Sequence, residues 1–181
     1  MKILLAVLAL SLPPMPAVAA SLDDALERFR ADFSGACALG QRGAGDPNLY
    51  LRRTAITHTL LQDGIPYRVF QILCRGKPTE GTWAFYVASP GKPARLLKFA
   101  EPGLGEDAEL LGWQWERLRE NPVVDAKRRE LRFEAWDAGT GRYFRSGVYR
   151  FDRGAFRLKA YEVAWMEGGF VRSRKVLGEL R

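Results

Sequence analysis

From residue 50 onward the sequence consists of short runs of β-branched and aromatic residues, and each run ends at a turn signal. The clearest pair is Thr54 to Gln62 and Ile65 to Cys74, which flank the dipeptide Asp63-Gly64. This dipeptide is typical of a two-residue hairpin turn, because both of its positions must adopt positive φ. Similar runs recur at spacings of about ten residues, which predicts about eight strands. The chain is therefore constrained to fold mainly into antiparallel β-structure.

Alternation within the runs indicates which side chains face the core. Leu131 and Phe133 alternate with charged residues, so this strand has one solvated face. Between Ala155 and Met166 the apolar positions shift by one residue, which predicts a β-bulge near Ala160. The two halves of the β region fold either as one sheet system or as two subdomains that join at residues 101–110.

One segment has helical periodicity. Apolar residues recur at helical spacing from Ser21 to Phe33, with Ser21 as a suitable N-cap and Asp24 at the third helical position. A Gly-rich loop follows from Gly40 to Pro47, and no other segment looks as helical. We therefore expect a mainly β protein at the margin of the α+β class. It would be an antiparallel β-sandwich or curved sheet of about eight strands with one N-terminal helix.

The first twenty residues have the features of a secretory signal peptide. Lys2 precedes an apolar run of about ten residues, and small residues follow it as far as Ala20. The run is too short to span a bilayer, which needs about twenty apolar residues. We expect cleavage after Ala19 or Ala20, with export of a single β-rich domain (residues 21–181) to the periplasm or the medium. A buried N-terminal helix is the alternative interpretation.

The chain contains two cysteines, Cys37 and Cys74, and both lie beyond this segment. In an oxidising compartment an even number of cysteines indicates disulfide bonding, and two cysteines allow a single intramolecular pair. We therefore predict a Cys37–Cys74 disulfide, with two buried free thiols as the alternative. Two cysteines and the single histidine do not supply the four ligands of a structural zinc site, so no metal is expected.

Motifs for catalysis or cofactor binding are not evident in the sequence. His58 lies between hydroxyl residues without a nucleophile motif, and we interpret it as a structural residue. The glycines from Gly40 to Gly45 precede Asp46-Pro47 instead of a helix, so they do not have the context of a phosphate-binding loop. The sequence thus predicts no cofactor and favours a protein that is not an enzyme. The alternative is a hydrolase, because carboxylates that could act as a pair occur close together in the sequence. These carboxylates are Asp23 with Asp24, Glu106 with Asp107 and Glu109, and Glu134 with Asp137.

Basic residues exceed acidic residues by 28 to 21, which gives a formal net charge of +7. The planar guanidinium group of arginine suits phosphate and carboxylate groups. Five arginines and two tyrosines fall in neighbouring hairpin strands, and we predict that they share a binding surface. These residues are Arg142, Arg145, Arg150, Arg153, Arg157, Tyr143 and Tyr149. The alternative interpretation is that the basic charge only keeps the protein soluble.

Three stretches of the β region resemble a known family of exported bacterial proteins. They are Thr82 to Val87 with Pro93 to Phe99, Asn121-Pro122 with Asp125 and Leu131, and Tyr149 to Asp152 with Ala155 to Leu158. Their order and spacing resemble the C-terminal half of the family called domain of unknown function 1176, over roughly residues 65–167. Residues 141–147 depart from it, because they contain no cysteine where we expect a Gly/Cys-rich turn in that family. The resemblance implies an exported β-rich fold and implies no activity.

These features together predict a periplasmic or secreted binding module without chemistry. Its partner would be an anionic component of the cell envelope, such as a phosphate or carboxylate group, or another protein. Aromatic residues interleaved with arginine also suit single-stranded nucleic acid, but export makes nucleic acid an unexpected partner. The alternative function is an envelope hydrolase that uses carboxylates of the Glu134 and Asp137 region.

Overall fold

The computed structural model describes residues 20–34, 37, 47–104, 110–136, 143–167 and 170–177. This part of the chain contains two helices and twelve strands, and all of the strand pairs are antiparallel. The predicted mainly β class with an N-terminal helix is confirmed. The elements are α1 (Leu22–Asp32), α2 (Pro47–Thr54), β1 (Ile56–Gln62), β2 (Ile65–Lys77), β3 (Glu80–Ala88), β4 (Arg95–Leu96), β5 (Phe99–Leu104), β6 (Leu110–Glu116), β7 (Leu118–Glu120), β8 (Val123–Asp125), β9 (Glu130–Trp136), β10 (Tyr143–Asp152), β11 (Ala155–Glu167) and β12 (Phe170–Leu177).

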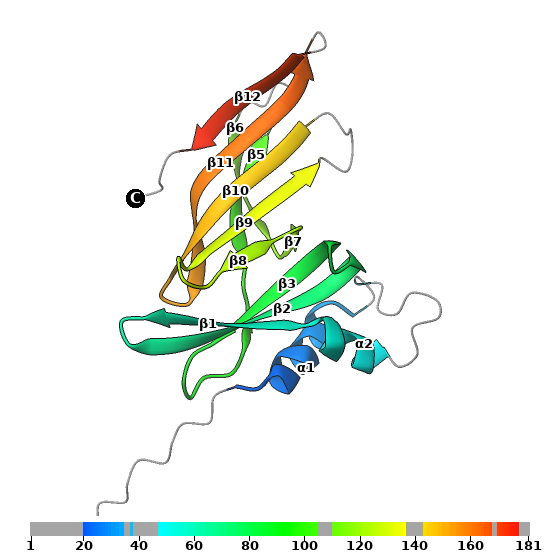
Figure 1. Cartoon of the computed structure of the whole chain (residues 1–181), viewed down its shortest axis with the longest axis vertical. Helices are drawn as coiled ribbons and strands as arrows, with labels where there is room; N and C mark the ends of the chain where they lie inside the picture. Colours follow the sequence, from blue (N-terminus) through cyan, green and yellow to red (C-terminus); the bar gives the residue numbers. More distant parts are fainter. Residues whose placement is uncertain are drawn as a thin grey trace, which may run out of the picture.

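The described strands form two five-stranded sheets and one two-stranded hairpin. The first sheet has the order β1-β2-β3-β4, and β7 also pairs with β3. The second sheet has the order β12-β11-β10-β9-β8, and β5 pairs with β6. Figure 1 shows the helices on one side of the first sheet and the second sheet on its other side. The first sheet is therefore the middle layer of the molecule.

Strand β3 is buried on both faces because it belongs to this middle layer. Trp83, Phe85 and Val87 join the core between the two sheets. Ala84 and Tyr86 join a second core beneath the helices. The sequence of β3 is accordingly apolar at successive positions, as expected for a strand that is covered on both sides.

Aromatic rings fill the space between the two sheets. Phe99 of β5 packs edge-on against Phe85 of the first sheet and Tyr149 of the second, with ring centroids 5.6 and 5.2 Å apart. Phe156 of β11 stacks on the same ring at 6.0 Å. Residues from both sheets and from the β5–β6 hairpin thus belong to one core cluster.

The predicted hairpin turn and the predicted bulge are both confirmed. Asp63 and Gly64 have φ values of 51° and 77°, and they join β1 directly to β2. The register between β10 and β11 shifts between Val148 and Tyr149, where Ala160 lies opposite Val148. Local sequence patterns therefore identified the features that set strand register here.

The expectation of a single helix is wrong, because Pro47–Thr54 forms α2. Proline suits the first position of a helix, since its φ is already fixed and the N–H that it lacks would have no partner there. Leu51 is 1% exposed and shares the helix-side core with Phe70 of β2. A helix this short depends on tertiary burial more than on its own sequence pattern, which explains why the pattern did not indicate it.

Parts of the sequence predictions lie outside the described residues. Among these parts are the predicted signal peptide as far as residue 19 and residues 40–46 of the predicted Gly-rich loop. Within the described chain, neither helix has the length and apolar character needed to cross a membrane.

Helix α1 begins as the sequence predicts, with a reciprocal capping box. The Oγ of Ser21 accepts a hydrogen bond from the backbone N–H of Asp24 at 3.1 Å, and the Asp24 carboxylate accepts one from the backbone N–H of Ser21 at 2.7 Å. These bonds lower the pKa of Asp24. Leu26 and Phe29 then bury the inner face of the helix against the first sheet.

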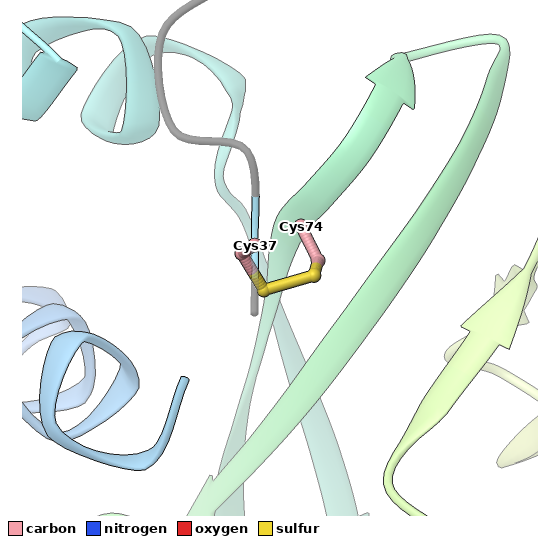
Figure 2. The surroundings of a disulfide bond; sticks show 2 residues. All are labelled: Cys37 and Cys74. Carbon is pink, nitrogen blue, oxygen red and sulfur yellow. A yellow bond between two sulfur atoms is a disulfide. The ribbon is translucent and has the colours of Figure 1, made fainter. Parts of the chain in front are cut away.

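The predicted disulfide is confirmed, and it joins a residue shortly after α1 to the first sheet. Cys37 and Cys74 are bonded, with their Cα atoms 4.8 Å apart (Figure 2). Cys74 lies in β2, and both cysteines are buried in the helix-side core. The bond therefore holds the α1 segment on the face of the first sheet that is turned away from the second sheet.

Removing this bond should lower the stability of the fold substantially. For the double variant Cys37→Ser/Cys74→Ser, the free energy of unfolding should fall by about 4 kcal/mol, because the lost crosslink frees a long loop of the unfolded chain. Urea unfolding of the wild type and the variant measures the difference. Wild-type protein with reductant should match the variant, whereas equal stability of all samples would contradict the prediction.

Candidate functional site

The residues predicted to share a binding surface do not lie on one surface. Tyr149 is fully buried, and Arg145 is turned toward the core. Arg150 and Arg157 are exposed on the outer face of the second sheet. Arg142 lies outside the described residues. The prediction of one continuous arginine surface is therefore wrong.

The period of two along an extended strand explains this separation. In β10, Tyr143, Arg145 and Tyr149 occupy alternate positions on the inner face, whereas Arg150 falls on the outer face. Arg153 lies in the turn between β10 and β11, with a φ of 47°, and is exposed. The predicted residues are close together in the sequence, but this closeness does not show which of them lie on the inner face of the second sheet and which on its outer face.

The outer arginines belong to a surface of mixed charge. Arg157 pairs with Asp152 at 3.0 Å. Arg150 lies opposite Arg157 on one side and opposite Glu130 on the other. Glu130 in turn pairs with Arg132 at 3.3 Å. These contacts do not make a uniformly basic patch.

The inner side of the same strands contributes to a buried group that we call the charge cluster: Glu101, Arg119, Arg145, Tyr149 and Tyr161. Glu101 of β5 is 2% exposed. Its Oε2 accepts a hydrogen bond from Nη1 of Arg119 at 2.8 Å. Its Oε1 accepts hydrogen bonds from Nη1 of Arg145 at 2.9 Å and from Oη of Tyr161 at 2.8 Å. Both carboxylate oxygens are therefore engaged.

Arg119 of β7 is the most buried cation of the charge cluster, with 4% exposed. Its Nη2 donates to Oη of Tyr149 at 2.8 Å, and this hydroxyl donates to the backbone carbonyl of Ala100 at 2.9 Å. The Cζ atom of Arg119 lies 4.7 and 4.9 Å from the ring centroids of Phe99 and Phe133. Cation–π contacts and hydrogen bonds thus compensate for the water that the guanidinium loses on burial.

The charge cluster carries a net charge of +1, because one carboxylate faces two guanidinium groups. Burial raises the pKa of Tyr149 and of Tyr161, so both hydroxyls stay protonated. Burial alone would lower the pKa of Arg145, but the Glu101 carboxylate, the Tyr161 hydroxyl and the Glu120 carboxylate together outweigh this effect, and the pKa is raised. Arg145 is therefore a permanent cation.

Arg145 also lines a pocket of about 430 Å³, which we call the Arg145 pocket. The pocket lies between the β5–β6 hairpin and the first residues of β10. The hairpin contributes Leu104, Trp113 and Gln114, and β10 contributes Tyr143 together with Arg145. The volume falls within the range of about 300–1,000 Å³ that is usual for small-molecule sites. The side chain of Arg145 is 26% exposed, so it connects the buried charge cluster to this pocket.

Glu101 and Arg119 were not among the predicted site residues. Glu101 falls in the stretch that the sequence suggests as a join between two subdomains, and Pro102 and Gly103 follow it, but all three residues belong to β5. The available signal was its spacing of two residues from Phe99, which places both side chains on one face of a strand. The position of Arg119 depends on the pairing of β7 with β3, and no local pattern indicates that pairing.

The other candidates from the sequence do not assemble into a catalytic group in the described part of the chain. Nε2 of His58 lies 3.0 Å from Oε1 of Gln71 on the neighbouring strand, a contact that suits a structural residue. Residues 105–109, with their three carboxylates, and Asp137 lie outside the described chain. Among the described residues, no three His, Cys, Asp or Glu side chains are grouped so as to hold a metal ion.

No family model, curated protein or solved structure matches this chain. The resemblance to the family called domain of unknown function 1176 stays a prediction.

Replacing Glu101 with Gln should destabilise the fold by about 3–5 kcal/mol, because two guanidinium groups lose their shared counter-charge. Tyr161→Phe is the matched comparison, since it removes one hydrogen bond of the same carboxylate but leaves every charge; it should cost about 1 kcal/mol. Urea unfolding at neutral pH measures both losses. Equal losses would show that charge balance is not what Glu101 contributes.

Gly147 of β10 should tolerate no side chain, because a Cβ there would overlap the ring of Phe133 that packs on Arg119. We expect Gly147→Ala to lower the free energy of unfolding by about 1–3 kcal/mol. Gly103, in the lining of the Arg145 pocket, is the control, because a Cβ there meets nothing nearer than the carbonyl oxygen of Gly112 at 3.7 Å. Thermal unfolding of the two alanine variants compares them, and a similar loss in both would contradict the assigned role of Phe133.

Proposed function

We propose that this chain is an exported binding protein without catalytic chemistry, and that it holds an anionic component of the cell envelope in the Arg145 pocket. One observation carries the proposal. A permanently charged guanidinium, fixed from behind by Glu101, lies in the wall of a pocket large enough for a small ligand. Arginine in such a position pairs with carboxylate or phosphate groups through its planar fork.

The charge cluster supports binding because it orients Arg145 in advance. Glu101 holds Nη1 of Arg145 and is itself held by Arg119 and Tyr161. The arginine side chain therefore loses little conformational freedom when a ligand binds, which improves affinity. The net charge of +1 on the cluster favours an anion over a neutral ligand.

Export forms part of the same proposal. Its support is the N-terminal sequence, with one cation, a short apolar run and small residues up to Ala20. The Cys37–Cys74 bond agrees with it, since disulfides persist in oxidising compartments. In the envelope the available anions are phosphate and carboxylate groups, and the formal charge of +7, which becomes +6 once Lys2 is removed with the signal peptide, favours encounter with both.

The described lining of the Arg145 pocket favours binding over hydrolysis. Carboxylate-based glycoside hydrolysis requires two carboxyl groups on opposite sides of the bond that is cleaved. The described residues that line this pocket carry no carboxyl group. Glu101 lies behind Arg145, and both of its oxygens already accept hydrogen bonds.

Arg145→Gln should abolish binding to purified envelope fractions, while Arg150→Gln should bind like the wild type. Both variants remove one positive charge from β10, but Arg150 lies on the outer face. Glu101 retains Arg119 and Tyr161 in Arg145→Gln, so the variant should still fold. Co-sedimentation with each fraction, over a titration of salt, measures the binding.

Wild-type binding should weaken as salt rises, because an ion pair contributes to it. Thermal unfolding of each variant verifies that the folded protein is being compared. Equal weakening by the two substitutions would assign binding to general surface charge and contradict the role of the pocket. Absence of wild-type binding to every fraction, even at low salt, would contradict the proposed function.

A further inference from the structure

We propose that the ligand of the Arg145 pocket is a saccharide that carries a carboxylate group. This inference rests on the proposed function and names the chemical class of the anion. The pocket combines a cation, aromatic rings, an amide and exposed backbone within one small volume. Each of these four features matches a different part of an acidic sugar.

Aromatic rings come from two separate elements. Trp113 of β6 and Tyr143 of β10 both line the pocket, and Trp113 is 44% exposed. The apolar C–H face of a sugar ring packs on such an aromatic surface, while the hydroxyl groups at the ring edge remain free to form hydrogen bonds. A small inorganic anion has no apolar face that could pack on these aromatic rings.

Hydrogen-bonding groups lie next to the aromatic rings. The side-chain amide of Gln114 offers both donors and an acceptor, the combination that hydroxyl groups require. Gly103 and Gly112 lie opposite each other in the hairpin and line the same pocket without side chains. A Cβ added at Gly112 would meet nothing within 4 Å, so this backbone faces open space. The hairpin backbone is therefore accessible to a ligand.

The charge of the pocket suits a monovalent anion. Arg145 is the charged residue among the described residues of the lining, and the charge cluster behind it has a net charge of +1, which the nearby Glu120 carboxylate reduces in effect. One carboxylate neutralises this charge and matches the planar guanidinium. A phosphate monoester carries nearly two negative charges at neutral pH and would leave part of its charge uncompensated.

The same features disfavour a lipid surface as the ligand. An acidic membrane attracts proteins through clustered cations, whereas the outer arginines of the second sheet are interspersed with carboxylates.

Binding of defined probes to the full mature chain tests the inference. The acidic probes are an oligogalacturonate and soluble disaccharide-peptides from digested peptidoglycan, which separate uronic acids from peptidoglycan as the source of the carboxylate. A maltooligosaccharide of the same length is the neutral probe, and phosphatidylglycerol vesicles are the lipid probe. Titration calorimetry should detect binding of at least one acidic saccharide and of neither other probe.

Trp113→Ala should weaken that binding about tenfold through loss of the packed ring. Trp115→Ala is the matched control, because Trp115 lies on the same strand and is exposed but is not among the residues that line the pocket. Gln114→Ala should also weaken binding. In nuclear magnetic resonance spectra of the wild type, the ligand should shift the indole N–H signal of Trp113 and leave that of Trp115 unchanged.

The two proposals fail on different results. Binding to vesicles alone, or an unchanged affinity in Trp113→Ala, would overturn the saccharide inference while Arg145-dependent binding to envelope fractions upheld the proposed function. The same holds if neither acidic saccharide binds but an envelope fraction does. If the wild type binds no probe and no envelope fraction, the proposed function fails as well.

Discussion

The buried carboxylate of Glu101 is the interaction on which the arrangement of the sheets depends. The carboxylate comes from β5, and its hydrogen-bond donors come from β7 of the first sheet and from β10 and β11 of the second. A buried ion pair is favourable only when its geometry is good and its remaining hydrogen bonds are satisfied. A shift of one sheet against the other would separate Glu101 from a guanidinium and leave a buried charge without its partner. The aromatic core provides most of the buried apolar surface, whereas the charges specify how the layers meet.

The same constraint gives the Arg145 pocket one rigid wall. Arg145 is held to Glu101 and belongs to the long central strand β10, which pairs with β9 and β11 over most of its length. The opposite wall is the β5–β6 hairpin, whose two strands pair with each other and form no part of either five-stranded sheet (Figure 1). The inner side of that hairpin is anchored by Phe99 and Glu101. The pocket therefore lies where a rigid sheet meets an appended hairpin, an arrangement that positions a cation accurately beside a surface of aromatic and amide groups.

Local sequence patterns predicted the local structure, and they failed where structure depends on distant partners. The Asp63-Gly64 turn, the bulge at Ala160 and the Ser21 cap each follow from a few neighbouring residues, so the sequence was sufficient. Helix α2 and the charge cluster follow from burial against other elements. Glu101 finds partners 18, 44 and 60 residues away in sequence, and nothing near it indicates that its charge is neutralised. The arginine surface was mispredicted for a related reason, since closeness along β10 and β11 does not say which face a side chain takes. The signal for the charge cluster was the position of Glu101 two residues after Phe99, because this spacing places a charged side chain on the same strand face as a core aromatic ring.

The charge cluster contains more positive than negative charge, because Glu101 pairs with two arginines. Glu101 and Arg119 are almost fully buried, whereas Arg145 is partly exposed at the pocket. The Nε atoms of both arginines are buried without a hydrogen-bond partner among the described residues. A purely structural ion pair would need one cation for its carboxylate, whereas Glu101 pairs with two, and the carboxylate of Glu120 adds only a weaker attraction to Arg145. The surplus positive charge lies at Arg145, the end of the cluster that opens to solvent, where a bound anion would neutralise it. Core packing alone would explain a buried cation such as Arg119, but it does not explain a second cation at the pocket. Under the proposed function, Arg119 stabilises the fold and Arg145 binds the ligand, although one carboxylate holds both.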